Sequence, residues 1–418
     1  MLDIKFIREN IDLIKKNCLN RKIKADVDEL LRLDNERRDF IQQIEEMRAE
    51  RNKKSKGKPS DEEIRQLKEV GERIKQFETK LNEIEQNYTK LLLLVPNLTH
   101  PNSPVGGEND FRVIFTEGEP TKFDFEPKDH EELMISLDLI DFERGAKVAG
   151  SKFYFVKNDG VRLNQALINY GIDTVAKHGY TIMETPDLAK DQILLGIGFN
   201  PRGLEAQLYS VENSDLSLVA TAEITVGGYH ADEVLDLSGG AKKYVALSHC
   251  FRTEAGSYGQ TSKGLYRVHQ FTKLEMFVFC RPEESEKYHE EILNIEKKIV
   301  DGLGLPYRVI DIPTGDLGGP AYRKYDIEAW MPMQNNYGEI TSCSNCTDYQ
   351  ARRLNIKYKK AGGGNDYVHT LNGTAVVSSR FPLAIVENFQ QADGSIAIPK
   401  VLQRYMGKEV IQRNWVNL

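Results

Sequence analysis

Residues 249–275 read HCFRTEAGSYGQTSKGLYRVHQFTKLE. This segment gives the clearest indication of the fold in the C-terminal part of the chain. Apolar and aromatic residues at the two ends flank a polar, glycine-containing middle, which predicts two strands of a hairpin joined by a long loop. Because side chains alternate along a strand, four charged groups and one aromatic ring would share a face if the strands pair. These residues are Arg252, Glu254, Arg267, Phe271 and Glu275.

A sheet face with two guanidiniums, two carboxylates and a phenyl ring needs a ligand, or partners for its charges. Guanidinium forks match phosphate oxygens, and a phenyl ring can stack on a purine. The face therefore indicates a site for a nucleoside triphosphate. An exposed face whose charges pair with one another is the alternative that these residues alone leave open.

The first hundred residues have a different pattern, in which steps of three and four keep one mainly apolar seam on each helix. The first seam comprises Leu30, Leu33, Arg37, Phe40, Ile44 and Met47. The second comprises Leu67, Val70, Ile74, Phe77, Leu81, Ile84, Tyr88, Leu91 and Val95. Gly57 and Pro59 would end the first helix, and Ser60 would cap the second. The pattern predicts an antiparallel coiled-coil arm over about residues 27–95, roughly 43 Å long at ~1.5 Å per residue.

Charge is placed unevenly along this arm. The whole chain has a formal net charge of −7, so contact with a polyanion requires a local basic patch. The tip of the arm is such a patch, with the cations Arg48, Arg51, Lys53, Lys54, Lys56 and Lys58. Two interpretations of this patch remain possible from its composition. It is a solvated lysine-rich turn, or it is the end of an arm that binds a phosphate backbone.

A linker rich in proline and glycine follows the arm, at residues 96–107. Beyond it, short β-type runs alternate irregularly with helical stretches. The β-type runs are 153–156, 243–247, 276–279 and 307–310, and the helical stretches are 162–178, 284–303 and 384–391. We therefore predict an α+β protein of two domains, with the arm in residues 1–108 and a mainly antiparallel sheet flanked by helices in residues 109–418.

The composition narrows the cellular setting. Five scattered cysteines, an odd number, favour a reducing compartment. The longest aliphatic run, residues 91–95, is too short to span a bilayer, and the N-terminus has no signal-peptide core, so we expect a cytoplasmic protein without membrane contact. Cys343 and Cys346 have no second pair of ligands at zinc spacing, which favours buried thiols over a metal site.

Several segments, taken in order, resemble the seryl-tRNA synthetases, which are class II aminoacyl-tRNA synthetases. FRTEAGSYG…GLYRVHQFTKLE resembles the second signature motif of that class, and LNGTAVVSSRFPLAIVENFQ, residues 371–390, resembles the third. The helix at 161–178 with the following HGYTIMETPDL is similar to the first motif, which implies a homodimer interface. Residues 221–223, 315–332 and 339–353 and the N-terminal arm also resemble the family.

The resemblance implies an enzyme that activates L-serine with ATP and transfers it to the 3′ end of tRNA(Ser), and of tRNA(Sec) where that is present. It implies ATP-binding roles for Arg252, Thr253, Glu254, Arg267, Val268, Phe271, Glu339, Ile340, Thr341, Ser342 and Arg380. It implies a serine pocket of Thr221, Ala222, Glu223, Arg252, Glu275, Asn372 and Thr374. The catalytic positions would be Arg252, Arg380 and Glu275, and Mg²⁺ would be held by Glu339 and Ser342.

The same resemblance assigns individual tasks. Arg252 would hold the α-phosphate and the serine carboxylate, while Arg380 would bind the far phosphate from the opposite side. Glu254 would accept a hydrogen bond from the adenine amino group, and Phe271 would stack under the adenine. The tip of the arm would contact the long variable arm of the tRNA, which now favours the phosphate-binding interpretation of its charge.

The third motif departs from the form common in the family. Thr374 and Ala375 stand where many members have serine and glycine, and Ser379 replaces a glycine beside Arg380. Three alternatives remain: a paralogue that loads a small amino acid onto a carrier protein, a non-catalytic regulatory homologue, and a coiled-coil scaffold. The retained arm argues against the first, the intact catalytic positions against the second, and the charged sheet face against the third.

Overall fold

The computed structural model describes residues 1–55, 60–200, 208–254 and 264–413. The chain forms two compact units, Met1–Leu98 and Thr99–Leu418. Residues 99–108 are tied to the second unit, because the N–H of His100 donates to the carbonyl of Tyr322 (2.9 Å) and the N–H of Thr314 to that of Pro104 (2.8 Å). The structural division therefore precedes the domain boundary that the sequence suggests after residue 108.

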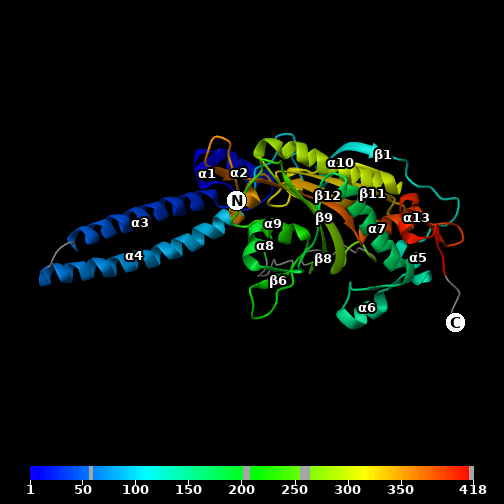
Figure 1. The fold of residues 1–418 in the computed structure, drawn as a ribbon, viewed down its shortest axis with the longest axis horizontal. Helices are drawn as coiled ribbons and strands as arrows, with labels where there is room; N and C mark the ends of the chain where they lie inside the picture. The colour runs from blue at the N-terminus through cyan, green and yellow to red at the C-terminus, as the bar shows by residue number, and fades with distance from the viewer. Residues whose placement is uncertain (56–59, 201–207, 255–263, 414–418) are drawn as a thin grey trace. The chain divides into compact units, whose positions relative to one another are not determined.

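The first unit is helical (Figure 1). Its helices are α1 (Ile4–Glu9), α2 (Ile11–Asn20), α3 (Val27–Lys54) and α4 (Asp61–Leu94). Arg37 of α3 pairs with Glu85 of α4 at 3.3 Å, and Arg48 pairs with Glu78 at 2.7 Å. Because later residues of α3 meet earlier residues of α4, the two helices are antiparallel, and the predicted arm is confirmed. Ser60 caps α4 in a capping box with Glu63.

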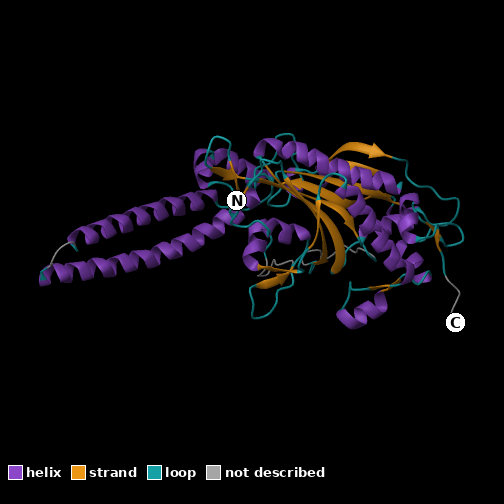
Figure 2. Cartoon of the chain, viewed as in Figure 1, coloured by secondary structure: helices purple, strands orange, loops and turns teal. Residues whose placement is uncertain are grey.

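An eight-stranded sheet is the centre of the second unit (Figure 2). Its strands, in spatial order, are β1 (Arg112–Glu117), β10 (Tyr307–Asp311), β11 (Arg323–Met331), β12 (Asn336–Asn345), β15 (His369–Val377), β9 (Gln270–Cys280), β8 (Lys242–Phe251) and β4 (Thr181–Glu184). Only β4 runs parallel to its neighbour, so the predicted mainly antiparallel sheet is confirmed.

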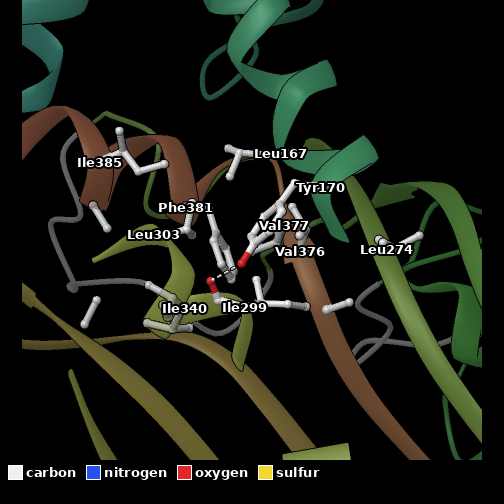
Figure 3. Packing of buried hydrophobic residues seen from close by; sticks show 14 of the residues in the cluster. Leu167, Tyr170, Leu274, Ile299, Leu303, Ile340, Val376, Val377, Phe381 and Ile385 are labelled. Atoms are coloured by element: carbon white, nitrogen blue, oxygen red, sulfur yellow. Dashed lines mark hydrogen bonds between the residues drawn. The ribbon is translucent and has the colours of Figure 1, made fainter. Parts of the chain in front are cut away.

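Helices cover both faces of the sheet because β9 is apolar on both sides. On one face, Leu274, Met276 and Val278 enter a large core. This core is closed by α5 (His130–Ser136), α7 (Asn158–Ala176), α10 (Ser285–Leu303), α12 (Arg380–Asn388) and α13 (Lys400–Met406). The hydroxyl of Tyr170 on α7 donates to the carbonyl of Ile299 on α10 at 3.3 Å (Figure 3).

The opposite face has a smaller core around Phe277 and Phe279. The helices there are α8 (Asp191–Ile197), α9 (Ala222–Gly228) and α11 (Tyr349–Leu354). The shorter elements are β2 (Ile140–Asp141), α6 (Phe142–Ala149), β3 (Phe155–Val156), β5 (Leu188–Lys190), β6 (Leu216–Leu218), β7 (Val234–Leu235), β13 (Lys357–Lys359), β14 (Asn365–Tyr367), β16 (Ile396–Ala397) and β17 (Val410–Ile411).

The expected hairpin forms, but its strands are shorter at the loop end than the sequence suggests. β8 ends at Phe251 and β9 begins at Gln270. Arg252, Glu254 and Arg267 therefore lie beyond the strands, and strand alternation was the wrong reason for placing them on one face. Glu254 has a φ of 52°, in the left-handed region, so the extended backbone has already ended there.

Candidate active site

A cavity of about 440 Å³ opens on the sheet face that α8, α9 and α11 border. Six of the residues predicted from the sequence line it: Thr221, Glu223, Arg252, Glu275, Ser342 and Asn372. Gly198, Phe199 and Asn200, in the loop after α8, also line it. Residues 201–203 of that loop lie outside the described residues.

Arg252 and Phe271 meet at the edge of this cavity. The guanidinium carbon of Arg252 lies 5.1 Å from the centre of the Phe271 ring, in a cation–π contact. The backbone of Arg252 is held on both sides by His269, because its N–H donates to the His269 carbonyl (2.9 Å) and its carbonyl accepts from His269 Nδ1 (2.7 Å). His269, which has no role in the sequence-based interpretation, thus orients the central arginine.

The other predicted nucleotide residues of this segment lie close by. Arg267 Nη1 is 3.4 Å from Glu254 Oε2, so the two pair with each other. Thr253 lies between Arg252 and Glu254 in a half-buried position, and Val268 is buried in the core. The segment thus brings both predicted arginines and Glu254 together through loop backbone and not through a shared strand face.

Arg380 approaches from the first residue of α12. Its Nη1 lies 2.9 Å from Glu339 Oε1 and its guanidinium lies 5.2 Å from the centre of the Tyr266 ring. Burial alone would raise the pKa of Glu339, but Arg380 and then Lys324 outweigh it and lower that pKa. Glu339 is therefore a carboxylate at neutral pH.

A bulge in β12 explains how Glu339 and Ser342, three residues apart, share one face. Glu339 is opposite Glu328 of β11, and Ser342 is opposite Asp326, with the register shift between them. Ile340 and Thr341 are buried on the other side, where Ile340 packs in the core (Figure 3) and the Thr341 hydroxyl donates to the Thr374 carbonyl. These two predicted ATP-binding residues can offer only backbone to the cavity face.

Three charged residues of β11 were missed by the sequence-based interpretation. Lys324, Asp326 and Glu328 alternate with apolar residues, and this alternation was the signal that could have found them. Burial raises the pKa of Asp326, despite a 3.1 Å pair with Lys324, and its Oδ1 has no hydrogen-bond partner among the described residues. These groups put two more carboxyls on the face of Glu339.

The residues of the predicted serine pocket form two hydrogen-bonded groups, one around Glu223 and one around Glu275. Glu223 Oε1 accepts from Asn372 Nδ2 at 2.9 Å and from Gln350 Nε2 at 2.8 Å. The Thr374 hydroxyl lies 3.5 Å from Glu275 Oε2, and the ammonium of Lys273 pairs with the same carboxylate. Thr221 caps α9, while Ala222 is fully buried behind it. Gln350 and Lys273 are further residues that the sequence did not reveal.

The pKa of Glu223 is displaced within its hydrogen-bonded group. Burial of its carboxyl, and then the nearby Glu275, raise that pKa to about 7. Hydrogen bonds from Gln350 oppose the change. Two acidic groups therefore face one small cavity, and one of them changes its charge near neutral pH.

The two cysteines of the Cys343-x-x-Cys346 pair have different environments. Cys343 faces the large core, whereas Cys346 lines the cavity, with Asn372 Nδ2 at 3.9 Å from its sulfur. All five cysteines are buried, and none of them forms a disulfide. Across the described ranges, no cluster of three or more His, Cys, Asp or Glu side chains suited to a metal is present.

The predicted cations at the arm tip are partly engaged within the arm. Arg48 pairs with Glu78, and Lys54 pairs with Glu50 at 2.7 Å. Arg51 is half-buried and Lys53 is exposed, while Lys56 and Lys58 lie outside the described residues. No helix within the described part of the chain is both long and apolar enough to cross a membrane.

Comparison with known proteins identifies the family. The model of the seryl-tRNA synthetase N-terminal domain matches residues 1–99, and that of the class II tRNA synthetase core domain (G, H, P, S and T) matches residues 209–389. The serine--tRNA ligase of Treponema denticola is 54% identical over 97% of this chain and 99% of its own. The chain belongs to the seryl-tRNA synthetase family.

Further relatives agree with this family. The serine--tRNA ligase of Rubrobacter xylanophilus is 50% identical over 98% of this chain and 99% of its own. The crystal structure of the Pyrococcus horikoshii seryl-tRNA synthetase complexed with ATP matches with a TM-score of 0.90 and 40% identity, covering 99% and 100% of the two chains. The cytoplasmic serine-tRNA ligase of Naegleria fowleri in complex with AMP matches with a TM-score of 0.85, at 33% identity and 99% coverage of both chains.

Proposed function

We propose that this chain is a serine--tRNA ligase, which uses ATP to activate L-serine and transfers it to tRNA(Ser), and to tRNA(Sec) where that is present. The observation that carries the proposal is the single cavity in which Arg252 faces the carboxyls of Glu223 and Glu275. An arginine there suits a phosphate, and two acidic groups suit an ammonium and a hydroxyl. Relatives at 54% and 50% identity over nearly the whole chain carry the same activity in their names.

The first step needs no nucleophile from the protein. An oxygen of the serine carboxylate forms a bond to the α-phosphorus of ATP, and the bond from that phosphorus to pyrophosphate breaks. Arg252 and Arg380 neutralise the negative charge that develops on the phosphoryl oxygens. In the structure, the Arg252 guanidinium lies over the Phe271 ring, 5.1 Å from its centre. When ATP binds, this guanidinium turns toward the phosphate, and adenine takes its place on the ring.

Mg²⁺ fits the oxygen donors on the β11–β12 face. Glu339 and Ser342 would hold it, and Asp326, whose Oδ1 has no partner within the described residues, lies on the same face. Bound there with ATP, the ion would supply positive charge that lowers the negative charge of the phosphate oxygens. Arg380, whose Nη1 lies 2.9 Å from Glu339 Oε1, would contact the far phosphate.

The second step transfers the seryl group. The terminal ribose hydroxyl of the tRNA forms a bond to the carbonyl carbon of the adenylate, and the bond from that carbon to the phosphate oxygen breaks. AMP leaves with the bonding electron pair and takes up the hydroxyl proton. The arm tip, with Arg51 and Lys53, would hold the long variable arm of the tRNA, since clustered cations bind phosphates by releasing counterions.

We include a homodimer and a cytoplasmic location in the proposal. The apolar side chain of Ile182, on the edge strand β4, is 54% exposed. Such a residue at an unpaired sheet edge is suited to contact a second copy. Five cysteines without a disulfide among them fit a reducing compartment.

Serine-dependent exchange of pyrophosphate into ATP, measured between pH 6 and 8, tests this function. Only the ionised form of Glu223 attracts the serine ammonium, and its pKa of about 7 means that this form is lost as the pH falls. We expect the KM for serine to rise about tenfold from pH 8 to pH 6, one factor of ten per pH unit below the pKa.

Two variants make this test specific. Glu223→Gln keeps an oxygen that accepts from Asn372 and Gln350, so it should raise the serine KM at every pH and remove the pH dependence. Glu291→Gln, at a half-buried carboxylate paired with Lys243 outside the cavity, should behave as wild type. No serine-dependent exchange in the wild type would refute the function, and a pH dependence kept by Glu223→Gln would refute this role of Glu223.

A further inference from the structure

We propose that His130 and Glu387 form a clamp that positions residues 265–267 of the ATP site against α12, an inference that rests on the proposed function. Neither residue touches the cavity. Both are almost completely buried, with 5% and 1% of their side chains exposed. Residues 265–267 carry Tyr266, which contacts Arg380, and Arg267, which pairs with Glu254.

Glu387 lies at the centre of three segments. Its Oε1 accepts from His130 Nδ1 at 2.8 Å and from the His130 backbone N–H at 3.3 Å. Its Oε2 accepts from the backbone N–H of Met333 at 3.3 Å. The carboxylate on α12 thus ties α5 and the turn after β11 to the helix that Arg380 begins.

The protonation pattern of His130 follows from its two partners. The backbone N–H of Leu265 donates to His130 Nε2 at 3.2 Å, so Nε2 carries no proton. The remaining ring proton is therefore on Nδ1 and is donated to Glu387. One imidazole ring thereby joins the main chain of the ATP segment to the carboxylate of α12.

Gly264 shows how closely this backbone approaches the ring. A Cβ added at Gly264 would lie 2.1 Å from His130 Nε2, and the residue has a φ of +61°. Both facts require glycine, because any side chain would push the segment off the imidazole. The contact is therefore built into the local backbone and is not a chance approach of two side chains.

The clamp has a direct route to the nucleotide groups. Tyr266 follows Leu265, whose backbone is bonded to His130. The Arg380 guanidinium lies 5.2 Å from the centre of the Tyr266 ring. A Cβ added at Gly338, the neighbour of Glu339, would lie 3.4 Å from the Tyr266 ring. Loss of the clamp should therefore displace Tyr266 and Arg380. Within the described ranges, Glu223, Asn372 and Gln350 make no hydrogen bond to His130, Glu387 or Leu265.

Because the clamp contacts the ATP groups and not the serine groups, its loss should affect the two substrates differently. A purely structural role would affect both alike. In His130→Asn the short amide can still donate toward Glu387 but cannot reach Leu265, so the KM for ATP in pyrophosphate exchange should rise about tenfold. The KM for serine should stay within about twofold. In His130→Gln the longer amide can accept from Leu265, so most of the affinity for ATP should return.

Two further variants keep the test decisive. Gly264→Ala leaves both clamp residues in place and should give the same selective rise in the ATP KM, which covers the case in which His130→Asn does not fold. His289→Gln is the matched control, because His289 is equally buried but contacts the Cys343 carbonyl at 3.3 Å and stacks on Tyr325. It should leave the ratio of the two KM values unchanged.

The outcomes separate this inference from the proposed function. A wild-type protein without serine-dependent exchange would remove the function and the clamp together. Normal wild-type exchange, with unchanged ATP KM in His130→Asn and Gly264→Ala, would overturn the clamp alone. Equal increases in both KM values would also overturn it, because they would indicate a general loss of structure.

Discussion

Arg252→Ala is expected to reduce serine-dependent ATP–pyrophosphate exchange by at least ~10³-fold, about 4 kcal/mol of transition-state stabilisation. Arg252 is the arginine that both lines the cavity and contacts Phe271. In the proposed reaction it neutralises the phosphoryl oxygens while charge develops, and alanine supplies no replacement. The loss should appear in kcat as well as in kcat/KM, because the interaction strengthens in the transition state.

A matched control is available on β9's C-terminal side. Arg281 is half-buried and donates to the Leu237 carbonyl at 2.9 Å, away from the cavity. Arg281→Ala should keep exchange within about threefold of wild type if it folds, because it removes a comparable guanidinium without touching substrate. Wild-type exchange in Arg252→Ala would show that the cavity is not the site of adenylate formation.

Shortening the arm should separate the two half-reactions. Replacing residues 49–77 by a short glycine-containing turn removes the other tip cations but keeps Arg48 and Glu78, whose 2.7 Å contact marks a place where α3 and α4 meet. Pyrophosphate exchange should be unchanged, because the cavity residues all belong to the second unit. Charging of tRNA should lose at least ~100-fold in kcat/KM, about 2.7 kcal/mol, as phosphate contacts disappear.

A charge-only variant identifies the cause of that loss. Changing Arg51, Lys53 and Lys54 to glutamine keeps the length of the arm, and it should weaken charging and reduce its dependence on salt. Changing three exposed lysines of the second unit, Lys147, Lys177 and Lys190, to glutamine is the matched control. Equal loss of exchange and charging in the shortened protein would contradict an arm that serves tRNA alone.

The periodicity of apolar residues was sufficient to predict the large helices and strands, but it did not predict where the strands end. The seams of the arm and the runs within β8, β9 and β10 are repeated patterns, so the sequence predicts them directly. The hairpin strands stop at Phe251 and Gln270, because Glu254 turns into the left-handed region and the loop backbone leaves the sheet. Arg252 and Phe271 still contact each other. The pairing of β8 with β9 places Cys250 opposite Phe271, and two hydrogen bonds to His269 hold the backbone of Arg252.

A sequence pattern does not reveal β-bulges or hydrogen-bond partners that are distant in the chain. Glu339 and Ser342 share a face only because β12 has one extra residue at Ile340, and simple alternation would place them on opposite faces. Gln350 and Lys273 act through hydrogen bonds to residues distant in the chain, so no local spacing marks them. His130 is separated from Glu387 by 257 residues, and only the folded chain brings the pair together.

The most direct test of the account measures pyrophosphate exchange by the wild-type protein with serine, threonine, alanine and glycine in turn. The account predicts that serine supports exchange and that alanine is about 10⁴-fold weaker in kcat/KM, because it leaves the buried groups around Glu275 and Thr374 without a hydroxyl partner. Threonine should also be weaker, because its extra methyl group would approach Thr374, whose hydroxyl lies 3.5 Å from Glu275 Oε2. Exchange with alanine or glycine as efficient as with serine would contradict the claim that this cavity recognises serine.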